Sequence, residues 1–177
     1  MMGRTHLLAT AILGMWLGWT LAMWFAATRS FRTVDRVLGE PTSELRQALA
    51  PLGHEQARTV LRHLASEINR TYFGAYGWAQ ILLGAILLAL FWYEARRATL
   101  GVVLAGVMLG LVVILTLIIQ PMIVSLGRSI DFVPRNPEPP QMARFWMLHG
   151  AFTGLDGVKL LAGLALLVRL IFTRMDR

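Results

Sequence analysis

The stretch 100–120 contains no charged side chain and consists almost entirely of aliphatic residues. A hydrocarbon core about 30 Å thick is crossed by roughly 20 mostly apolar residues in an α-helix, so this stretch has the length and composition of a transmembrane span. The whole chain agrees, because 56% of its residues are hydrophobic and only 15% are charged. These proportions exclude a disordered tail, a collagen-like rod and an ordinary soluble enzyme.

Three further segments meet the same length requirement, which gives four predicted spans. They are residues 5–28, 72–93, 100–120 and 145–172. Phe73 and Trp92, near the two ends of the second span, would lie roughly 28 Å apart along a helix, close to the separation of the two membrane interfaces. We therefore predict a single domain, residues 1–177, with an all-α fold: an integral membrane bundle of four transmembrane helices.

The first long connection, residues 29–71, contains a helical pattern of its own within 54–70. Its apolar side chains recur at helical spacing and predict an amphipathic helix in this loop. They are Ala57, Leu61, Leu64 and Ile68. Such a helix either lies along the membrane interface or runs straight into the second span as one long rod. Pro41 and Pro51 are predicted to break the chain before it.

An even number of spans places both long connections, 29–71 and 121–144, on the same face of the membrane. Most of the arginines lie in these connections, so the positive-inside rule predicts that they face the cytoplasm. All but one of the 17 basic residues are arginine, the exception being Lys159, which is typical of a GC-rich bacterial genome. We expect the chain in the cytoplasmic (inner) membrane of a bacterium.

The net charge of +7 arises from arginines that are scattered beside the apolar runs and not gathered on one polar face. We interpret them as anchors for lipid headgroups, and we expect no binding to nucleic acid. Because the chain has no cysteine, disulfides, thiolate metal sites and a cysteine nucleophile are excluded. The sequence has no phosphate-binding glycine loop, nucleophile elbow or zinc-protease motif, so no enzyme is predicted.

Small residues recur at every fourth position of the first span and form a ladder that lets another helix backbone approach closely. They are Thr10, Gly14, Gly18 and Ala22. Packing within the bundle is favoured over dimerisation, because the helices of this chain must find partners first. The fourth span carries a second stripe, with Gly150, Gly154 and Gly157. The Gln120-Pro121 pair is predicted to end the third span.

The fourth span also carries a polar stripe at helical spacing. Its members are His149, Thr153, Asp156 and Lys159. Asp156 lies about 16 Å along the helix from Phe145, near the bilayer midplane, where an unpaired carboxylate is costly. Lys159 is its nearest candidate partner. Two roles stay open: a functional one, as a proton relay, ion path or polar ligand pocket, and a structural ion pair that fixes helix register.

His149 is the member of the stripe that would bind a metal or haem, although a single membrane histidine more often has a structural role. No cofactor is predicted. Without a catalytic constellation, the chain is expected to be a non-catalytic accessory or assembly subunit of a larger membrane complex, in contact with lipid and other membrane-protein subunits. The alternative is a self-contained haem-, metal- or proton-handling membrane protein that uses the polar stripe.

Several short motifs are spread along the chain. They are Trp16-Leu17-Gly18 followed by Ser30-Phe31-Arg32, the Gln120-Pro121 pair, and Phe145 with His149-Gly150. In these motifs, which cover nearly its whole length, the chain resembles the bacterial four-span family called domain of unknown function 4149, related to the animal transmembrane protein 205-like proteins. The resemblance implies four spans and a distant similarity to copper-resistance-type and haem-associated membrane proteins, but no reaction. Asp156 stands where we expect the family to carry asparagine.

Overall fold

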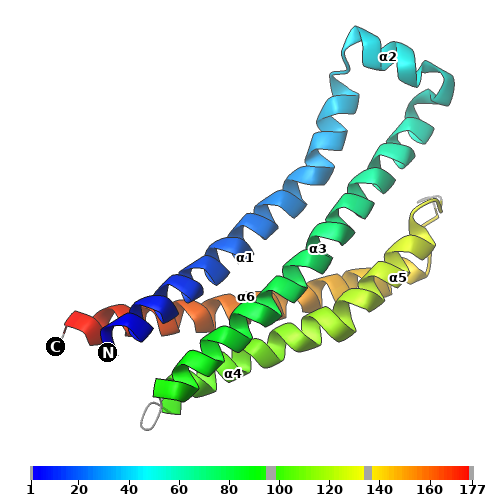
Figure 1. Ribbon diagram of the computed structural model, residues 1–177. Coiled ribbons are helices and arrows are strands. Elements are labelled where there is room, and N and C mark those ends of the chain that lie inside the picture. Colours follow the sequence, from blue (N-terminus) through cyan, green and yellow to red (C-terminus); the bar gives the residue numbers. More distant parts are fainter. Residues whose placement is uncertain (1, 95–98, 134–136, 176–177) are drawn as a thin grey trace.

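Four long helical segments dominate the computed structural model, which describes residues 2–94, 99–133 and 137–175 (Figure 1). In chain order the elements are α1 Met2–Gly39, α2 Ser43–Leu49, η1 Ala50–Leu52, α3 Gly53–Glu94, α4 Thr99–Ile114, η2 Leu115–Ile119, α5 Gln120–Ile130 and α6 Gln141–Met175. α2 and the 3-10 turn η1 join α1 to α3 at one end. α4 continues through the π-helical turn η2 into α5, and α6 packs against α1, α4 and α5.

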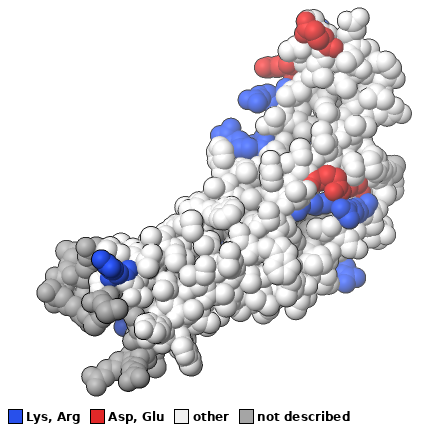
Figure 2. Space-filling model, in the orientation of Figure 1, with Lys and Arg blue, Asp and Glu red and all other residues white. Residues whose placement is uncertain are grey.

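Three of these segments are long and apolar enough to cross a membrane. They are Gly3–Gly39, Ser43–Tyr93 and Leu100–Ile130. α6 is not among them, and its charged residues are Arg144, Asp156, Lys159, Arg169 and Arg174. On the face shown in Figure 2, a broad belt without charged side chains separates the charged end near α2 from the end that holds both termini. The all-α bundle is confirmed, with three helices that could span a membrane, whereas the crossing by α6 stays a prediction.

The helix predicted for 54–70 is the first part of α3 and not a separate element. α1 has 38 residues and α3 has 42. These correspond to lengths of about 57 and 63 Å, roughly twice the thickness of the hydrocarbon core. The continuous rod is therefore the arrangement observed, because no proline interrupts α3. Pro41 and Pro51 do separate α1 from α3, and the tip formed by α2 extends well past α5 (Figure 1).

The Gln120-Pro121 pair does not end the third helical segment, which corrects the expectation from the sequence. α5 begins at Gln120, and the helical path continues to Ile130. The turn before it is π-helical, and the N–H of Gln120 donates to the carbonyl of Leu115. Proline has no N–H to donate and crowds the carbonyl of an ordinary α-helical turn. The wider turn in front of Pro121 therefore accommodates its ring without stopping the helix.

The apolar core lies between α1, α3, α4 and α6. Its buried side chains are Ala9, Leu13, Trp16, Leu17, Leu83, Leu87, Phe91, Ala105, Met108, Val112, Leu166 and Leu170. Helices approach one another closely at Gly77, Gly84 and Gly163. A Cβ atom added at Gly163 would lie 2.6 Å from Cδ2 of Leu17 and 3.0 Å from Cε of Met108. A larger residue at this position would therefore force the neighbouring side chains to move.

Four glycines of the two predicted packing stripes are exposed, and a Cβ added at any of them would meet no atom within 4 Å. They are Gly14 and Gly18 on α1, and Gly150 and Gly154 on α6. Of the remaining members, Thr10 is half-buried, Ala22 is exposed, and a Cβ at Gly157 would touch the ring of Trp24 at 3.9 Å. Within the part of the chain that the structure describes, both stripes are thus largely uncovered.

Candidate functional site

Asp156 and Lys159 lie one turn apart on α6, so their side chains leave the helix on the same face. Oδ1 of Asp156 lies 2.5 Å from Nζ of Lys159, and both side chains have an exposed fraction of 0%. Removing two charges from water is costly. Their attraction offsets this cost only when other groups saturate the remaining hydrogen-bonding positions. In this protein, those groups come from α1 and α3.

α1 places three side chains against the ion pair from successive turns. Trp16, Thr20 and Trp24 are spaced by four residues and share one face of the helix. Nε1 of Trp24 donates to Oδ2 of Asp156 at 2.8 Å, and Nζ of Lys159 donates to Oγ1 of Thr20 at 3.2 Å. The Thr20 hydroxyl donates in turn to the carbonyl of Trp16 at 3.1 Å. One face of α1 therefore contacts both members of the pair.

α3 adds Tyr76 and Gln80, again one turn apart and both buried. Nζ of Lys159 donates to the Tyr76 hydroxyl at 3.1 Å and to Oε1 of Gln80. The Tyr76 hydroxyl donates to Oδ2 of Asp156 at 3.4 Å. Nε1 of Trp16 donates to Oε1 of Gln80 at 2.9 Å. The ion pair is thus held by side chains from three helices.

We refer to this group of side chains as the polar core: Trp16, Thr20, Trp24, Tyr76, Gln80, Asp156 and Lys159. An ammonium group has three N–H donors, and four acceptors surround Nζ of Lys159. The carboxylate of Asp156 accepts from an ammonium, an indole and a phenol. Such a saturated arrangement fixes the relative positions of α1, α3 and α6. It also places a carboxylate, an ammonium and a phenol in contact, and each of these groups can exchange a proton.

Only half of the polar stripe predicted for α6 is covered, because α1 and α6 diverge along their length. Asp156 and Lys159 are covered, whereas Thr153 and His149, one and two turns earlier, are exposed. Near the termini α1 and α6 lie close together, and they diverge toward the start of α6 (Figure 1). The His149 ring stacks on Phe145 with centroids 6.0 Å apart, and the Thr153 hydroxyl donates to the carbonyl of His149 at 3.0 Å. The structure therefore brings only the second half of the stripe into the polar core.

Sequence reasoning identified the pair on α6 but not its partners on the other helices. Two features of the sequence indicated that other helices supply polar partners. Gln80 is the one strongly polar side chain within the second span, and the indole N–H groups of Trp16 and Trp24 need acceptors when they are buried. Neither feature states which helices meet. Thr20 and Tyr76 are ordinary residues for a span, so nothing in the sequence distinguishes them.

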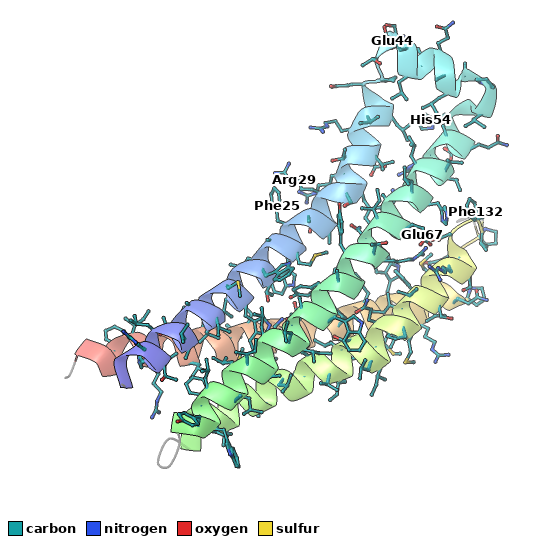
Figure 3. All side chains as sticks on the ribbon, viewed as in Figure 1. Phe25, Arg29, Glu44, His54, Glu67 and Phe132 are labelled. Atoms are coloured by element: carbon teal, nitrogen blue, oxygen red, sulfur yellow. The ribbon has the colours of Figure 1, made fainter. Side chains whose placement is uncertain are left out.

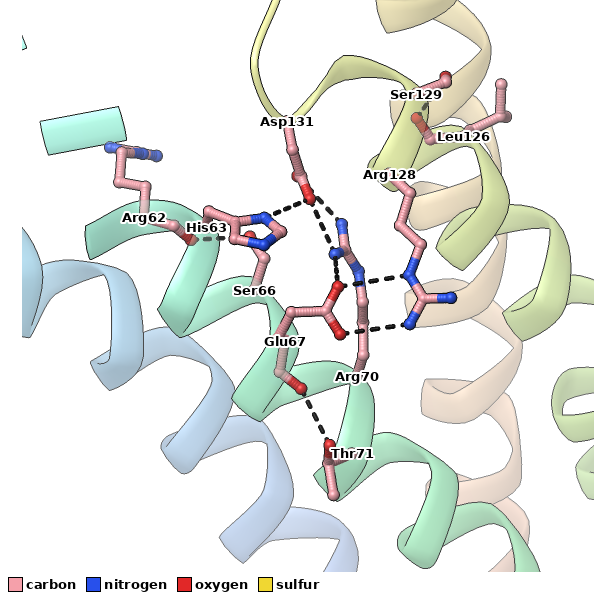
Figure 4. Close-up of polar contacts among 10 residues, drawn as sticks. All are labelled: Arg62, His63, Ser66, Glu67, Arg70, Thr71, Leu126, Arg128, Ser129 and Asp131. Atoms are coloured by element: carbon pink, nitrogen blue, oxygen red, sulfur yellow. Dashed lines mark hydrogen bonds and ion pairs between the residues drawn. The ribbon is translucent and has the colours of Figure 1, made fainter. Parts of the chain in front are cut away.

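A second group of charged side chains joins α3 to the end of α5 (Figure 4). Arg70 contacts Asp131 with both terminal nitrogens, Nη1 to Oδ2 at 2.8 Å and Nη2 to Oδ1 at 3.0 Å. Arg70 also donates to Glu67 at 2.5 Å, and Arg128 donates to both carboxylate oxygens of Glu67, at 3.3 and 3.2 Å. Nδ1 of His63 lies 2.9 Å from Oδ2 of Asp131. We call these five residues the charged cluster.

The charged cluster precedes the apolar stretch 72–93 of α3 and so lies outside the segment that would cross the bilayer. Hydrogen bonds from Arg128 and Arg70 lower the pKa of Glu67 from 4.5 to about 2. Burial alone would lower the pKa of Arg70, but its hydrogen bonds to Asp131 and Glu67 raise that pKa above its ordinary value. Glu67 and Arg70 are therefore held in their charged forms.

His63, Glu67 and Asp131 also offer ligand atoms that lie within 4.8 Å of one another, a spacing compatible with a metal ion. Their carboxylate oxygens are already engaged by Arg70 and Arg128. Two guanidinium groups at this distance repel a divalent cation. The charged cluster is therefore better suited to link α3 with α5 than to bind a metal.

Comparison of the chain with models of known families, with curated proteins and with solved structures finds no match. Membership of the four-span family that the motifs resemble therefore stays a prediction. Two features of the structure bear on the function: the saturated polar core and the uncovered glycines of α1.

Proposed function

We propose that the chain is a non-catalytic accessory or assembly subunit, which packs against helices of other membrane proteins through one face of α1. We call this the glycine face, made of Thr10, Gly14, Gly18 and Ala22. The observation that carries the proposal is the exposure of Gly14 and Gly18, where an added Cβ would meet no atom within 4 Å. α1 packs into its own bundle with a different face, which includes Leu13 and Leu17.

A glycine inside a helix costs about 1 kcal/mol relative to alanine, because the unfolded chain loses more backbone freedom when it is ordered. In contact with lipid tails, Gly14 and Gly18 offer no packing that would offset this cost. Against a second helix they allow the two backbones to approach closely, so that van der Waals and Cα–H···O contacts form along the crossing. A partner helix therefore gives both glycines a physical role.

The polar core supports a structural role for the bundle. Asp156 and Lys159 are enclosed and saturated, and they line neither the groove between α1 and α3 nor the groove beside Trp92. Because Thr20 and Trp24 point into the polar core, the rotation of α1 about its own axis is fixed. This rotation keeps the glycine face directed away from the bundle.

The proposal places the chain in a bacterial cytoplasmic membrane, with α6 as the fourth span and the α2 tip on the cytoplasmic side. Its support is the apolar belt of the bundle together with the arginines in the C-terminal half of α1. Gly150 and Gly154 on α6 form a second uncovered stripe, which would accept a further subunit.

The proposal is tested by native mass spectrometry of the full chain, extracted from its own membranes in a mild detergent. We expect a co-extracted subunit with the wild type, and most of it with Gly14→Ala/Gly18→Ala, whose methyl groups still permit close approach. Gly14→Ile/Gly18→Ile should lose the subunit but keep its unfolding temperature, because both positions are open in the isolated chain. A bare monomer of the wild type, or a homodimer as the only assembly, would contradict the accessory role.

A second candidate function is proton or ion handling by the polar core. One observation favours it: a fully buried carboxylate contacts both an ammonium and the Tyr76 phenol. Asp156→Asn removes the charge but keeps an acceptor for Trp24. If the wild type carries protons across proteoliposomes and the folded Asp156→Asn variant does not, proton handling replaces the accessory role. A haem-sized mass increment on a lone chain would instead favour the cofactor-binding alternative, with His149 as the candidate ligand.

A further inference from the structure

A groove runs between α1 and α3 in the part of both helices that extends beyond the predicted spans. Its volume is about 420 Å³, and its walls are mostly apolar. They include Ala26, Val34 and Val37 from α1, and Leu61, Ala65 and Ile68 from α3. Ala26 lies at the end of the predicted span 5–28, and Ile68 lies just before 72–93. The groove therefore opens at this end onto the apolar belt of the bundle.

The α3 edge of the groove is an exposed apolar ridge. Val60, Leu64 and Ile68 have exposed fractions of 48%, 56% and 40%. They are spaced by four residues and so lie along one side of α3. This part of α3 lies outside the predicted span, where exposure of a row of apolar side chains to water is unfavourable. Such a surface is typical of a binding site.

The α1 edge of the groove is basic. Arg29 lines the groove, with Cζ 4.9 Å above the ring of Phe25, and Figure 3 shows these two side chains next to each other on the flank of α1. Arg36 follows seven residues later on the same side, with Arg32 between them. Among the residues that the structure describes, no carboxylate oxygen lies within 4.0 Å of these three guanidinium groups. Figure 2 shows basic side chains along this half of α1.

On the other side of the same helix pair, positive charge is compensated. Asp35 accepts from Arg58 at 3.3 Å and from Arg62 at 3.4 Å. Of Arg29, Arg32 and Arg36, Arg29 lines the groove, and the other two lie on the same side of α1. An occupant that fits this site has an apolar body and carries a negative charge near α1.

We propose that the groove binds an anionic phospholipid that has moved outward from the adjacent leaflet along α1 and α3. Its phosphate contacts Arg29 and Arg36, and its acyl chains run past Leu64 and Ile68 and keep their ends in the bilayer. A guanidinium binds two phosphate oxygens through parallel hydrogen bonds. A lipid fits better than a protein segment because the groove opens onto the membrane and its basic edge matches a phosphate.

The absence of cysteine from the chain gives a direct test, because Leu64→Cys creates a single labelling site in the groove. The labelled full chain is reconstituted in vesicles of phosphatidylcholine and phosphatidylglycerol, and one of the two lipids carries brominated acyl chains, which quench a fluorophore on contact. At equal mole fraction, brominated phosphatidylglycerol should quench the label at position 64 more strongly. At Val103→Cys, an exposed position in the apolar part of α4, the two lipids should quench equally.

The charge requirement is tested with Arg29→Gln/Arg36→Gln. Titration of the phosphatidylglycerol fraction gives a relative binding constant at position 64. We expect it to fall roughly 30-fold, which corresponds to about 1 kcal/mol for each arginine. The matched control is Arg4→Gln/Arg46→Gln, which changes the net charge equally at the start of α1 and in α2, away from the groove. This control should leave the preference unchanged.

Equal quenching by the two lipids at position 64 would overturn the proposal, and so would a preference that survives Arg29→Gln/Arg36→Gln. Quenching by neither lipid would also overturn it, and self-quenching between labels would then identify a second copy of the chain as the occupant. The proposal requires the chain to lie in a membrane but does not depend on the glycine face. Since Gly14 and Gly18 are unchanged in all these variants, its failure is distinguishable from failure of the accessory role.

Discussion

Arg70 on α3 and Asp131, the residue that follows α5, form a bidentate ion pair, with nitrogen–oxygen distances of 2.8 and 3.0 Å. Their side chains are exposed by only 12% and 9%, so water screens the pair much less than it screens an ordinary surface salt bridge. The pair joins segments that are far apart in the sequence and fixes the end of α5 against α3.

Asp131→Asn should lower the free energy of unfolding by about 2–3 kcal/mol, because it removes the carboxylate that binds both terminal nitrogens of the largely buried Arg70 and leaves only Glu67 as an ionic partner. The control is Asp35→Asn, since Asp35 is 48% exposed and pairs with arginines that are also exposed. We expect its loss to stay below about 0.5 kcal/mol. Chemical unfolding of both variants in the same detergent measures the difference, and equal losses would contradict the role of the buried pair.

Glu67 should make stability depend on pH in the acid range. Its pKa in the folded chain is about 2, below its ordinary value of 4.5. The stabilisation is therefore fully present above pH 4.5 and is lost as the pH falls from 4.5 toward 2. We expect the unfolding temperature of the wild type to exceed that of Glu67→Gln above pH 4.5, with the gap closing below it. A gap that stays constant over this range, or one that Glu40→Gln reproduces, would argue against the effect.

Lys159→Met should lower the free energy of unfolding by about 3–5 kcal/mol, because Asp156 then becomes an unpaired buried charge. The double variant Asp156→Asn/Lys159→Met carries no charge in the polar core and should recover a large part of this loss. A double-mutant cycle based on chemical unfolding measures the coupling. Losses that simply add would mean that the two groups do not stabilise each other.

Two glycines of α6 should respond differently to the same substitution. Gly163→Leu should destabilise the isolated chain by about 1–3 kcal/mol, because the new side chain meets Leu17 and Met108. Gly154→Leu adds the same atoms where a Cβ meets none, so the isolated chain should be unaffected or slightly stabilised by the gain in helix propensity. Thermal unfolding of the two purified variants gives the comparison, and similar shifts would show that α6 is packed differently.

Three helices that could cross a membrane were predictable because hydrophobicity and length are local properties of the sequence. The same holds for the pairing of Asp156 with Lys159, which follows from their separation by one helical turn. The remainder of the polar core could not be predicted. Thr20 and Gln80 reach Lys159 only through the packing of three helices, and a single sequence does not state which helices meet or at what angle.

The two mismatches with the sequence-based expectations have separate physical causes. Pro121 is a helix breaker in an ordinary turn, and nothing in the neighbouring aliphatic residues indicates that a π-helical turn precedes it. The stripe of Gly14 and Gly18 shows that a close approach is permitted, but not whether the approaching helix belongs to this chain.

The π-helical turn η2 also sets the angular phase between the two halves of the third helical segment. Such a turn holds one residue more than an α-helical turn, and one residue corresponds to about 100° around the helix axis. α4 directs Met108 into the apolar core, and after this offset the end of α5 directs the following residue, Asp131, toward Arg70. Deletion of one residue from the turn would rotate Asp131 away from α3 while Met108 stayed in place. The additional residue in this turn therefore allows Met108 to pack in the apolar core while Asp131 contacts Arg70. An uninterrupted α-helix of this sequence would not place both side chains in these positions.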